Sequence, residues 1–174
     1  MWLQTQLYRH SVAIATILPY AAPMQNSAAP KSTAAWAALL TVHAVVVDAI
    51  EARLKAAQLP PLAWYDVLWA LERAPDTRLR MAELAERLVV SRYNVTRLID
   101  RLEAARLVER EPALDDARGA YAVLSAAGKA TRRRMWPVYA GAIDELFLCH
   151  LSAREKQTLE AALGKVLAAR RSRR

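Results

Sequence analysis

Apolar residues recur every three or four positions along most of the chain, which is the spacing of one face of a helix. The first stripe follows Ser32 or Thr33, either of which can cap a helix, and a pair of prolines ends it. A second stripe predicts another helix that closes near Pro75. The stripes consist of Trp36, Leu39, Leu40, His43, Val46, Val47, Ile50 and Leu54, and then of Trp64, Val67, Leu68 and Leu71.

Two short helices with a break between them are predicted next, over residues 81–88 and 91–105. Ser91 can cap the second of these helices, whose inward positions are Val95, Leu98, Ile99 and Leu102. Beyond Arg106 the pattern changes, and residues 107–110 and 120–124 predict two short strands. A polar loop over residues 111–119 joins them, so a helix-turn-helix followed by a β-hairpin is expected.

A long helix should begin after Ser125 and run to about His150. Ser152 and Glu155 then have the spacing of a capping box, which starts a final helix that leads into the basic tail of residues 170–174. The order is four helices, a hairpin and two helices. The fold class predicted from this order is mostly α with a small β-wing, a winged helix-turn-helix core flanked by N- and C-terminal helices.

Composition excludes several classes of site. The chain has one cysteine and three scattered histidines, so neither an intrachain disulfide nor a zinc-ligand spacing is present. Cys149 is expected to be a buried bystander in a cytoplasmic protein. No nucleophile–base arrangement, glycine-rich phosphate loop or paired-carboxylate site stands out, so we expect no catalysis, no metal and no cofactor.

The formal net charge of +8 suggests an anionic partner. The excess is unevenly placed, because residues 60–125 carry ten basic and eleven acidic side chains, whereas residues 126–174 carry eleven and four. The central segment is therefore nearly neutral, and individual arginines must carry any argument for nucleic-acid binding.

The second helix of the predicted helix-turn-helix shows hydrogen-bonding side chains on its outer face, as a DNA-recognition helix must. The N-terminus of a helix also offers free backbone N–H groups to a phosphate. The alternative is an ordinary antiparallel helix pair with a solvated face. The candidate DNA-binding residues here are Ser91, Arg92, Asn94, Thr96, Arg97 and Arg101.

The hairpin loop adds a second candidate contact. Arg118 lies near its tip, where an arginine can enter the narrow, electronegative minor groove. Asp116 could hold Arg118 by an ion pair, and Gly119 permits the chain to return. The alternative is a solvated turn with a surface ion pair, which contributes under about 1 kcal/mol.

A basic cluster follows the second strand. The first turns of the long helix hold Lys129, Arg132, Arg133 and Arg134. Helical spacing places Lys129 on one face with Arg132 or Arg133, whereas Arg134 points elsewhere. Because this helix begins beside the wing, we expect the cluster to lie near the DNA backbone. A solvated helix face that never approaches phosphate is the alternative.

The stretch RMAELAERLVVSRYNVTRLIDRLEAARLVEREPALDDARGAYAVLSAAGKA resembles the MarR family of winged helix-turn-helix transcription regulators. The matching features are the helix-turn-helix, the Asp-x-Arg-Gly wing and the Leu-Ser-x-x-Gly entry into the next helix. The resemblance covers about residues 33–170. Many members have glycine where this chain has Arg106, and threonine where it has Ser125.

The resemblance implies a homodimer, a pseudo-palindromic operator in double-stranded DNA and a role as a repressor. It divides the chain into an N-terminal extension of uncertain role (1–31), a dimerisation helix (32–59), a winged helix-turn-helix DNA-binding domain (60–125) and C-terminal dimerisation helices with a basic tail (126–174). The extension is open to three interpretations: a dimer arm, residues upstream of a start at Met24, or a targeting signal. Its apolar run over residues 11–23 is too short to span a bilayer, and no membrane contact is expected.

The resemblance also implies release from DNA by a small effector, which in this family is often an aromatic carboxylate or a phenol. Trp and Tyr can stack on such a ligand, and Tyr or His can bond its polar end, although tryptophans at helical spacing more often belong to a core. Asp66 is expected either to pair with an arginine of the DNA-binding head or to lie at the surface. The candidate effector residues are Trp36, His43, Trp64, Tyr65 and Trp69. The rival to a DNA-binding regulator is a helical protein-interaction module without DNA binding.

Overall fold

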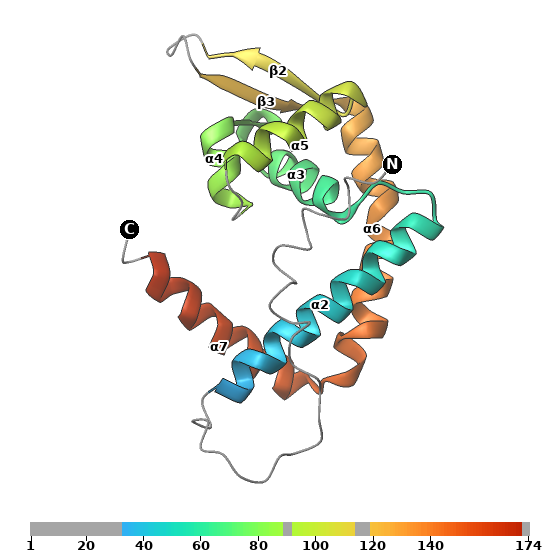
Figure 1. Cartoon of the computed structure of the whole chain (residues 1–174), viewed down its shortest axis with the longest axis vertical. Coiled ribbons are helices and arrows are strands. Elements are labelled where there is room, and N and C mark those ends of the chain that lie inside the picture. Colours follow the sequence, from blue (N-terminus) through green and yellow to red (C-terminus); the bar gives the residue numbers. More distant parts are fainter. Residues whose placement is uncertain (1–32, 89–91, 114–118, 172–174) are drawn as a thin grey trace. The chain divides into compact units, whose positions relative to one another are not determined.

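The computed structural model describes residues 33–88, 92–113 and 119–171. Contacts divide the chain into two units, residues 1–49 and 50–174. In chain order (Figure 1) the elements are α2 (Thr33–Ala56), α3 (Leu62–Glu72), the 3-10 turn η2 (Pro75–Thr77), β1 (Arg78–Arg80), α4 (Met81–Arg87), α5 (Arg92–Ala104), β2 (Val108–Pro112), β3 (Ala120–Leu124), α6 (Ala126–Leu146), the 3-10 turn η3 (Leu148–His150) and α7 (Ala153–Arg171). The predicted fold class, mostly α with a small β-wing, is confirmed.

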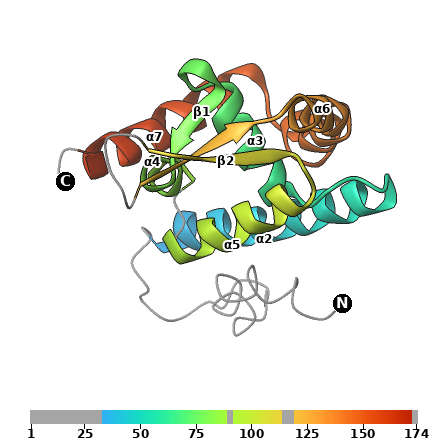
Figure 2. The ribbon, with the colours of Figure 1, turned by 90° about the horizontal axis from the view of Figure 1, so that it is seen from above.

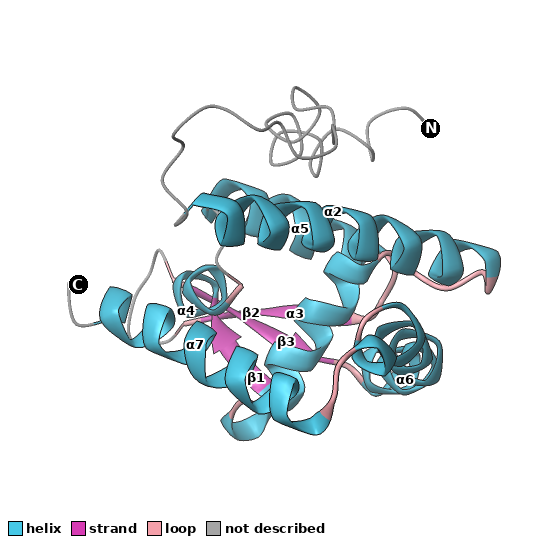
Figure 3. Cartoon of the chain, turned by 90° about the horizontal axis from the view of Figure 1, so that it is seen from below, coloured by secondary structure: helices cyan, strands magenta, loops and turns pink. Residues whose placement is uncertain are grey.

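The sheet has three antiparallel strands in the order β1-β3-β2. The predicted hairpin forms, with Val108 opposite Leu124 and Pro112 opposite Ala120. The third strand, β1, was not expected; it pairs with the other side of β3 and packs with it against α3 and α4 (Figure 3). Its sequence Arg-Leu-Arg buries only Leu79, so it is too short to show the two-residue period of a strand.

One apolar core holds together the winged part of the chain, which consists of α3, α4, α5 and the three-stranded sheet. Each of its fully buried side chains contributes roughly 1.5–3 kcal/mol relative to an exposed one. The core joins α3, α4, α5 and the sheet, and therefore fixes the helix-turn-helix against the wing. Its members include Val67, Leu68, Leu71, Leu84, Val95, Ile99, Leu102, Val108, Ala122 and Leu124.

The end of α2 belongs to this packed part. Ile50 and Leu54 are buried, and Arg53 forms an ion pair with Glu145 of α6, with Nη1 2.7 Å from Oε2. The earlier residues of α2, 33–49, carry large exposed apolar side chains, including Trp36, which is 62% exposed. By length and composition, α2 is the one helix among the described residues that could cross a membrane.

The turn from α5 into β2 uses a residue with a left-handed backbone. Arg106 has φ 59°, its N–H donates to Glu103 O, and the Leu107 N–H donates to Leu102 O at 2.9 Å. These are the two bonds of a Schellman motif, in which glycine is the favoured residue at the position of Arg106. The sequence departs from the family pattern at this point and keeps the backbone conformation that suits glycine.

Arg106→Gly should therefore stabilise the protein. Removing the Cβ relieves about 1–2 kcal/mol of left-handed strain, and the greater freedom of glycine in the unfolded chain offsets part of it. We expect a net gain of about 0.5–1 kcal/mol in the free energy of unfolding, measured by urea denaturation. A loss of stability would show that the arginine side chain makes a compensating contact.

Ser125 fixes the start of α6. Its Oγ accepts a hydrogen bond from the Gly128 N–H at 3.0 Å and donates one to Arg106 O at 2.8 Å. Gly128 is buried at the same junction, where an added Cβ would lie 2.1 Å from Leu107 O. The entry into α6 is thus packed directly against the chain that links α5 to β2.

The C-terminal helices largely follow the prediction. The capping box of α7 is confirmed, since the Ser152 N–H donates to Glu155 Oε2 at 2.8 Å and the Glu155 N–H donates to Ser152 Oγ at 3.4 Å. The long helix ends at Leu146, a few residues before the expected end. The prediction for Cys149 is wrong: it is exposed, because it lies in η3 between the two helices, where its thiol donates to Glu145 O.

Candidate nucleic-acid interface

Helix α5 carries two opposed faces. Val95, Ile99 and Leu102 are fully buried in the winged core. On the other side, Asn94, Arg97 and Arg101 follow one another at three- and four-residue spacing, which places them on a common face. Arg97 is exposed, while Asn94 and Arg101 are partly exposed. We call these three residues the polar face of α5.

The other candidate DNA-binding residues of the helix-turn-helix are not members of the polar face. Thr96 is exposed, and it lies on the side of α5 that contacts β2, where its backbone O accepts a hydrogen bond from Arg110. Arg92 is the first residue of the helix. Ser91 lies outside the described residues, as does the rest of the turn between α4 and α5.

The wing is described at its base. The Ala113 N–H donates to Gly119 O at 2.9 Å, which continues the ladder between β2 and β3 (Figure 1). Asp116 and Arg118 lie outside the described residues. The structure therefore places β2 against α5 and Gly119 at the end of the β2–β3 ladder, and the contact expected of Arg118 stays a prediction.

The two acidic side chains of α5 share one arginine of the sheet. Arg110 of β2 pairs with Asp100 and with Glu103, at 2.5 and 3.0 Å. Sequence reasoning missed this residue, because its partners lie seven and ten residues away in another element. The polar face of α5 itself carries the positive charges of Arg97 and Arg101, which suits a polyanion.

One member of the predicted phosphate-contacting cluster is placed elsewhere. The Arg132 Nε faces Glu72 Oε2 of α3, with both side chains only 13% and 15% exposed, and the Arg132 Cζ lies 5.0 Å from the centroid of the Trp69 ring. The expectation for Arg132 is therefore wrong, because α6 docks this face on α3. Arg133 is exposed and Lys129 partly so, and both still fit the predicted role.

The effector candidates fall into two groups. Trp36 and His43 are exposed on α2, in the first of the two units of the chain. Trp64 packs against the winged core. Tyr65 is 4% exposed, and its ring stacks on that of Trp69, with centroids 6.4 Å apart.

The cluster around Tyr65 includes two residues that sequence reasoning missed. Trp136 of α6 stacks on Tyr65 with ring centroids 6.1 Å apart, and Tyr139 meets Tyr65 edge-on at 5.0 Å. No sequence signal joins these residues to α3, since the contact depends on how α6 docks. Trp69 and Trp136 are 39% and 47% exposed, so the cluster reaches the surface.

Asp66 fits neither expected role. Burial raises its pKa to about 6, and the negative charge of Glu51 adds to the effect. Glu51 itself accepts a hydrogen bond from the Leu62 N–H at 3.0 Å, at the start of α3. Burial also raises the pKa of Tyr139 above its ordinary value, with Asp66 as a further cause. Asp66 is thus a partly buried carboxyl in an acidic neighbourhood.

No group of three His, Cys, Asp or Glu side chains that could hold a metal gathers within residues 33–88, 92–113 and 119–171. What the site offers is a recognition-type helix with a wing beside it (Figure 2).

Comparison with known proteins also identifies similarity to DNA-binding regulators. A model of the MarR family matches residues 57–119. AbsC, a MarR family transcriptional regulator from Streptomyces coelicolor, superposes with a TM-score of 0.75 at 27% identity, over 85% of this chain and 99% of that one. No curated protein matches the sequence.

Two similar structures contain DNA. Sco3205, a MarR family transcriptional regulator from S. coelicolor in complex with DNA, has a TM-score of 0.75 at 25% identity, over 84% of this chain and 91% of that one. A mutant MarR from E. coli complexed with operator DNA has a TM-score of 0.71 at 26% identity, over 82% and 99%. Residues 57–119 therefore match the MarR family model, and the fold is similar to that of solved MarR family transcriptional regulators, two of them bound to DNA.

Proposed function

We propose that the protein is a homodimeric, sequence-specific regulator, a repressor, that binds a pseudo-palindromic operator in the cytoplasm. The observation that carries the proposal is the polar face of α5, which stands opposite a fully buried face and beside the β2–β3 wing. Such a helix enters the major groove while a wing contacts the neighbouring minor groove. The DNA-bound relatives support this use of the two elements.

Arg97 and Arg118 should contribute differently to DNA binding. Arg97→Ala removes a donor from the polar face and should lower discrimination at particular base pairs, by about 1–3 kcal/mol each. Arg118→Ala should weaken binding to most sequences together, because a minor-groove arginine reads width and A·T content. Gel-shift titration of both variants would measure this. If both bound like the parent, the DNA-binding face would have to lie elsewhere.

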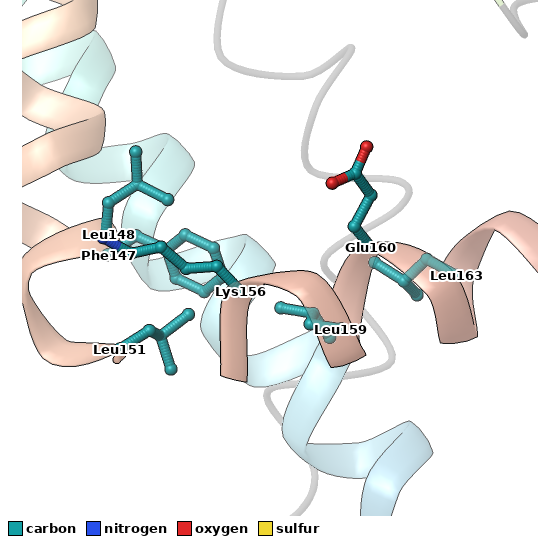
Figure 4. A pocket seen from close by; sticks show the side chains of 7 residues that line it. All are labelled: Phe147, Leu148, Leu151, Lys156, Leu159, Glu160 and Leu163. Carbon is teal, nitrogen blue, oxygen red and sulfur yellow. The ribbon is translucent and has the colours of Figure 1, made fainter. Parts of the chain in front are cut away.

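We further propose that a second copy covers the exposed apolar surfaces of the flanking helices. On α7, Val166 and Leu167 are 68% and 62% exposed. Beside them Phe147, Leu148, Leu151, Leu159 and Leu163, with Lys156 and Glu160, line an open hollow of about 250 Å³ (Figure 4). Contiguous apolar surface of this kind marks an interaction site.

The apolar surface of α2 fits the same partner better than a membrane. Its last turns are packed in the winged part, where Ile50 and Leu54 are buried and Glu51 contacts α3. That leaves residues 33–49, which span about 25 Å as a helix, less than the roughly 30 Å of a bilayer core.

Charge introduced on α7 should therefore break the dimer. We expect the parent to have the mass of two copies by light scattering at micromolar concentration, and Val166→Asp/Leu167→Asp to have the mass of one. Thr158→Asp, on an exposed polar position of the same helix, is the matched control and should stay dimeric. A parent of monomeric mass would contradict the proposal.

We also propose that a small aromatic effector binds at the Tyr65–Trp69–Trp136–Tyr139 cluster. Two partly exposed indoles offer stacking area, and Arg73 lies with its Cζ 5.4 Å from the Trp69 ring, where it could attract a carboxylate. Benzoate is a suitable probe. It should quench tryptophan fluorescence in the parent and fail to do so in Trp69→Leu, and equal quenching in both would place the effector elsewhere.

A further inference from the structure

Arg110 joins the wing to the helix that carries the polar face. Its side chain leaves β2 and reaches three acceptors on α5: Nη2 donates to Asp100 Oδ1 at 2.5 Å and to Thr96 O at 3.3 Å, and Nη1 donates to Glu103 Oε2 at 3.0 Å. A planar guanidinium with fixed donor directions holds such a set in one relative orientation. We call this set the Arg110 clamp.

The clamp holds a side of α5 that the core does not. At about 100° per residue, positions 96, 100 and 103 form a narrow stripe along one side of the helix. The buried residues Val95, Ile99 and Leu102 lie on a second side, and the polar face on a third. The core sets the distance between α5 and the rest of the winged domain. The Arg110 clamp, which holds α5 from the side, opposes rotation of the helix about its own axis.

Rotation matters for this helix in particular. Rotation of α5 about its axis changes which base edges the side chains of the polar face can reach. Direct readout of bases needs hydrogen-bond donors that are placed to within about half an ångström. The same clamp fixes the slant of α5 relative to β2, and so relative to the wing. An arginine that contacts no base can in this way determine how well bases are discriminated.

Resting on the DNA binding proposed above, we infer that Arg110 is a positioning residue for sequence discrimination, acting through the orientation of α5 and not through contact with DNA. Its charge is already opposed by two carboxylates, Asp100 and Glu103, so the clamp as a whole carries one net negative charge. A group of that sign does not attract a phosphate.

The probe is the duplex that the parent protein recovers from a pool of random duplexes, compared with a shuffled duplex of the same base composition. Arg110→Lys keeps the positive charge but replaces the planar guanidinium, which donates to three acceptors, with a single ammonium group. We expect its affinity for the recovered duplex to fall about tenfold or more, the effect of removing one good bidentate interaction with a base. Affinity for the shuffled duplex should stay within about threefold, because phosphate contacts carry no sequence information.

A second variant separates orientation from charge. Arg110→Met combined with Asp100→Asn and Glu103→Gln removes the clamp and leaves the protein one unit more positive than the parent. If Arg110 acted only by neutralising the carboxylates, this variant would discriminate as well as the parent. We expect discrimination to stay low, with circular dichroism showing both variants folded at the assay temperature.

Arg78→Lys, on the exposed side of β1, is the matched control and should discriminate like the parent. Full discrimination by both Arg110 variants would overturn the inference while the proposed function stood. A parent that recovers no sequence from the pool would overturn the proposed function, and the inference with it.

Discussion

Gly128→Ala is expected to lower the melting temperature by about 6–12 °C, corresponding to a loss of about 3 kcal/mol in the free energy of unfolding. The added Cβ would lie 2.1 Å from Leu107 O and 2.8 Å from Leu124 Cδ1. The first of these atoms belongs to the backbone, so no side-chain rotation relieves the overlap. Helix α6 would have to move away from the wing and weaken the cap that Ser125 provides.

Gly141→Ala is the matched control, because it lies in the same helix and an added Cβ there meets nothing within 4 Å. Alanine is the better helix former by about 1 kcal/mol, so this variant should melt at or above the temperature of the parent. Calorimetry on the two variants measures the difference. Equal melting temperatures would show that the α6 entry is not packed as the structure has it.

Asp66→Asn is expected to stabilise the protein at neutral pH by up to about 3 kcal/mol. The pKa of Asp66 is raised from 3.8 to about 6 in the folded state, because burial disfavours the carboxylate and Glu51 repels it. Between these two values the folded protein keeps a proton that the unfolded chain releases. Stability therefore falls as pH rises through this window, and the cost is fully present above about pH 6.

Asparagine has nearly the same size and does not ionise, so the variant escapes this cost. The stability difference between Asp66→Asn and the parent should be near zero at pH 3.5, grow through pH 4–6 and stay constant above. Urea denaturation over this pH range measures it, and Asp144→Asn, at an exposed position of α6, is the control. A difference that shrinks as pH rises would contradict the assignment.

The sequence predicted those features that depend on local pattern. The apolar stripes located α2, α3, α4 and α5 to within a few residues, because apolar residues recur at helical spacing in each of these helices. The Ser152–Glu155 capping box was found in the same way, since both partners lie within one turn. Strand β1 could not be found, because three residues with one buried leucine carry no period.

Features that depend on docking of distant elements could not be predicted. Arg132 looked like part of a solvated basic cluster until the packing of α6 on α3 placed it against Glu72 and Trp69. The Tyr65–Trp136 stack arises from the same packing. The Arg110 clamp needs β2 to lie beside α5, which the spacing of its residues along the chain does not state.

That two copies of this chain recognise a DNA sequence is tested most directly by selection from a pool of random duplexes, followed by footprinting on the recovered sequence. We expect an imperfect palindrome whose half-sites lie about 10–10.5 base pairs apart, with binding that weakens as salt is raised. Protection should cover both half-sites on one face of the duplex. A pool that shows no enrichment, with no duplex retained even at low salt, would contradict DNA recognition and favour a helical protein-interaction module.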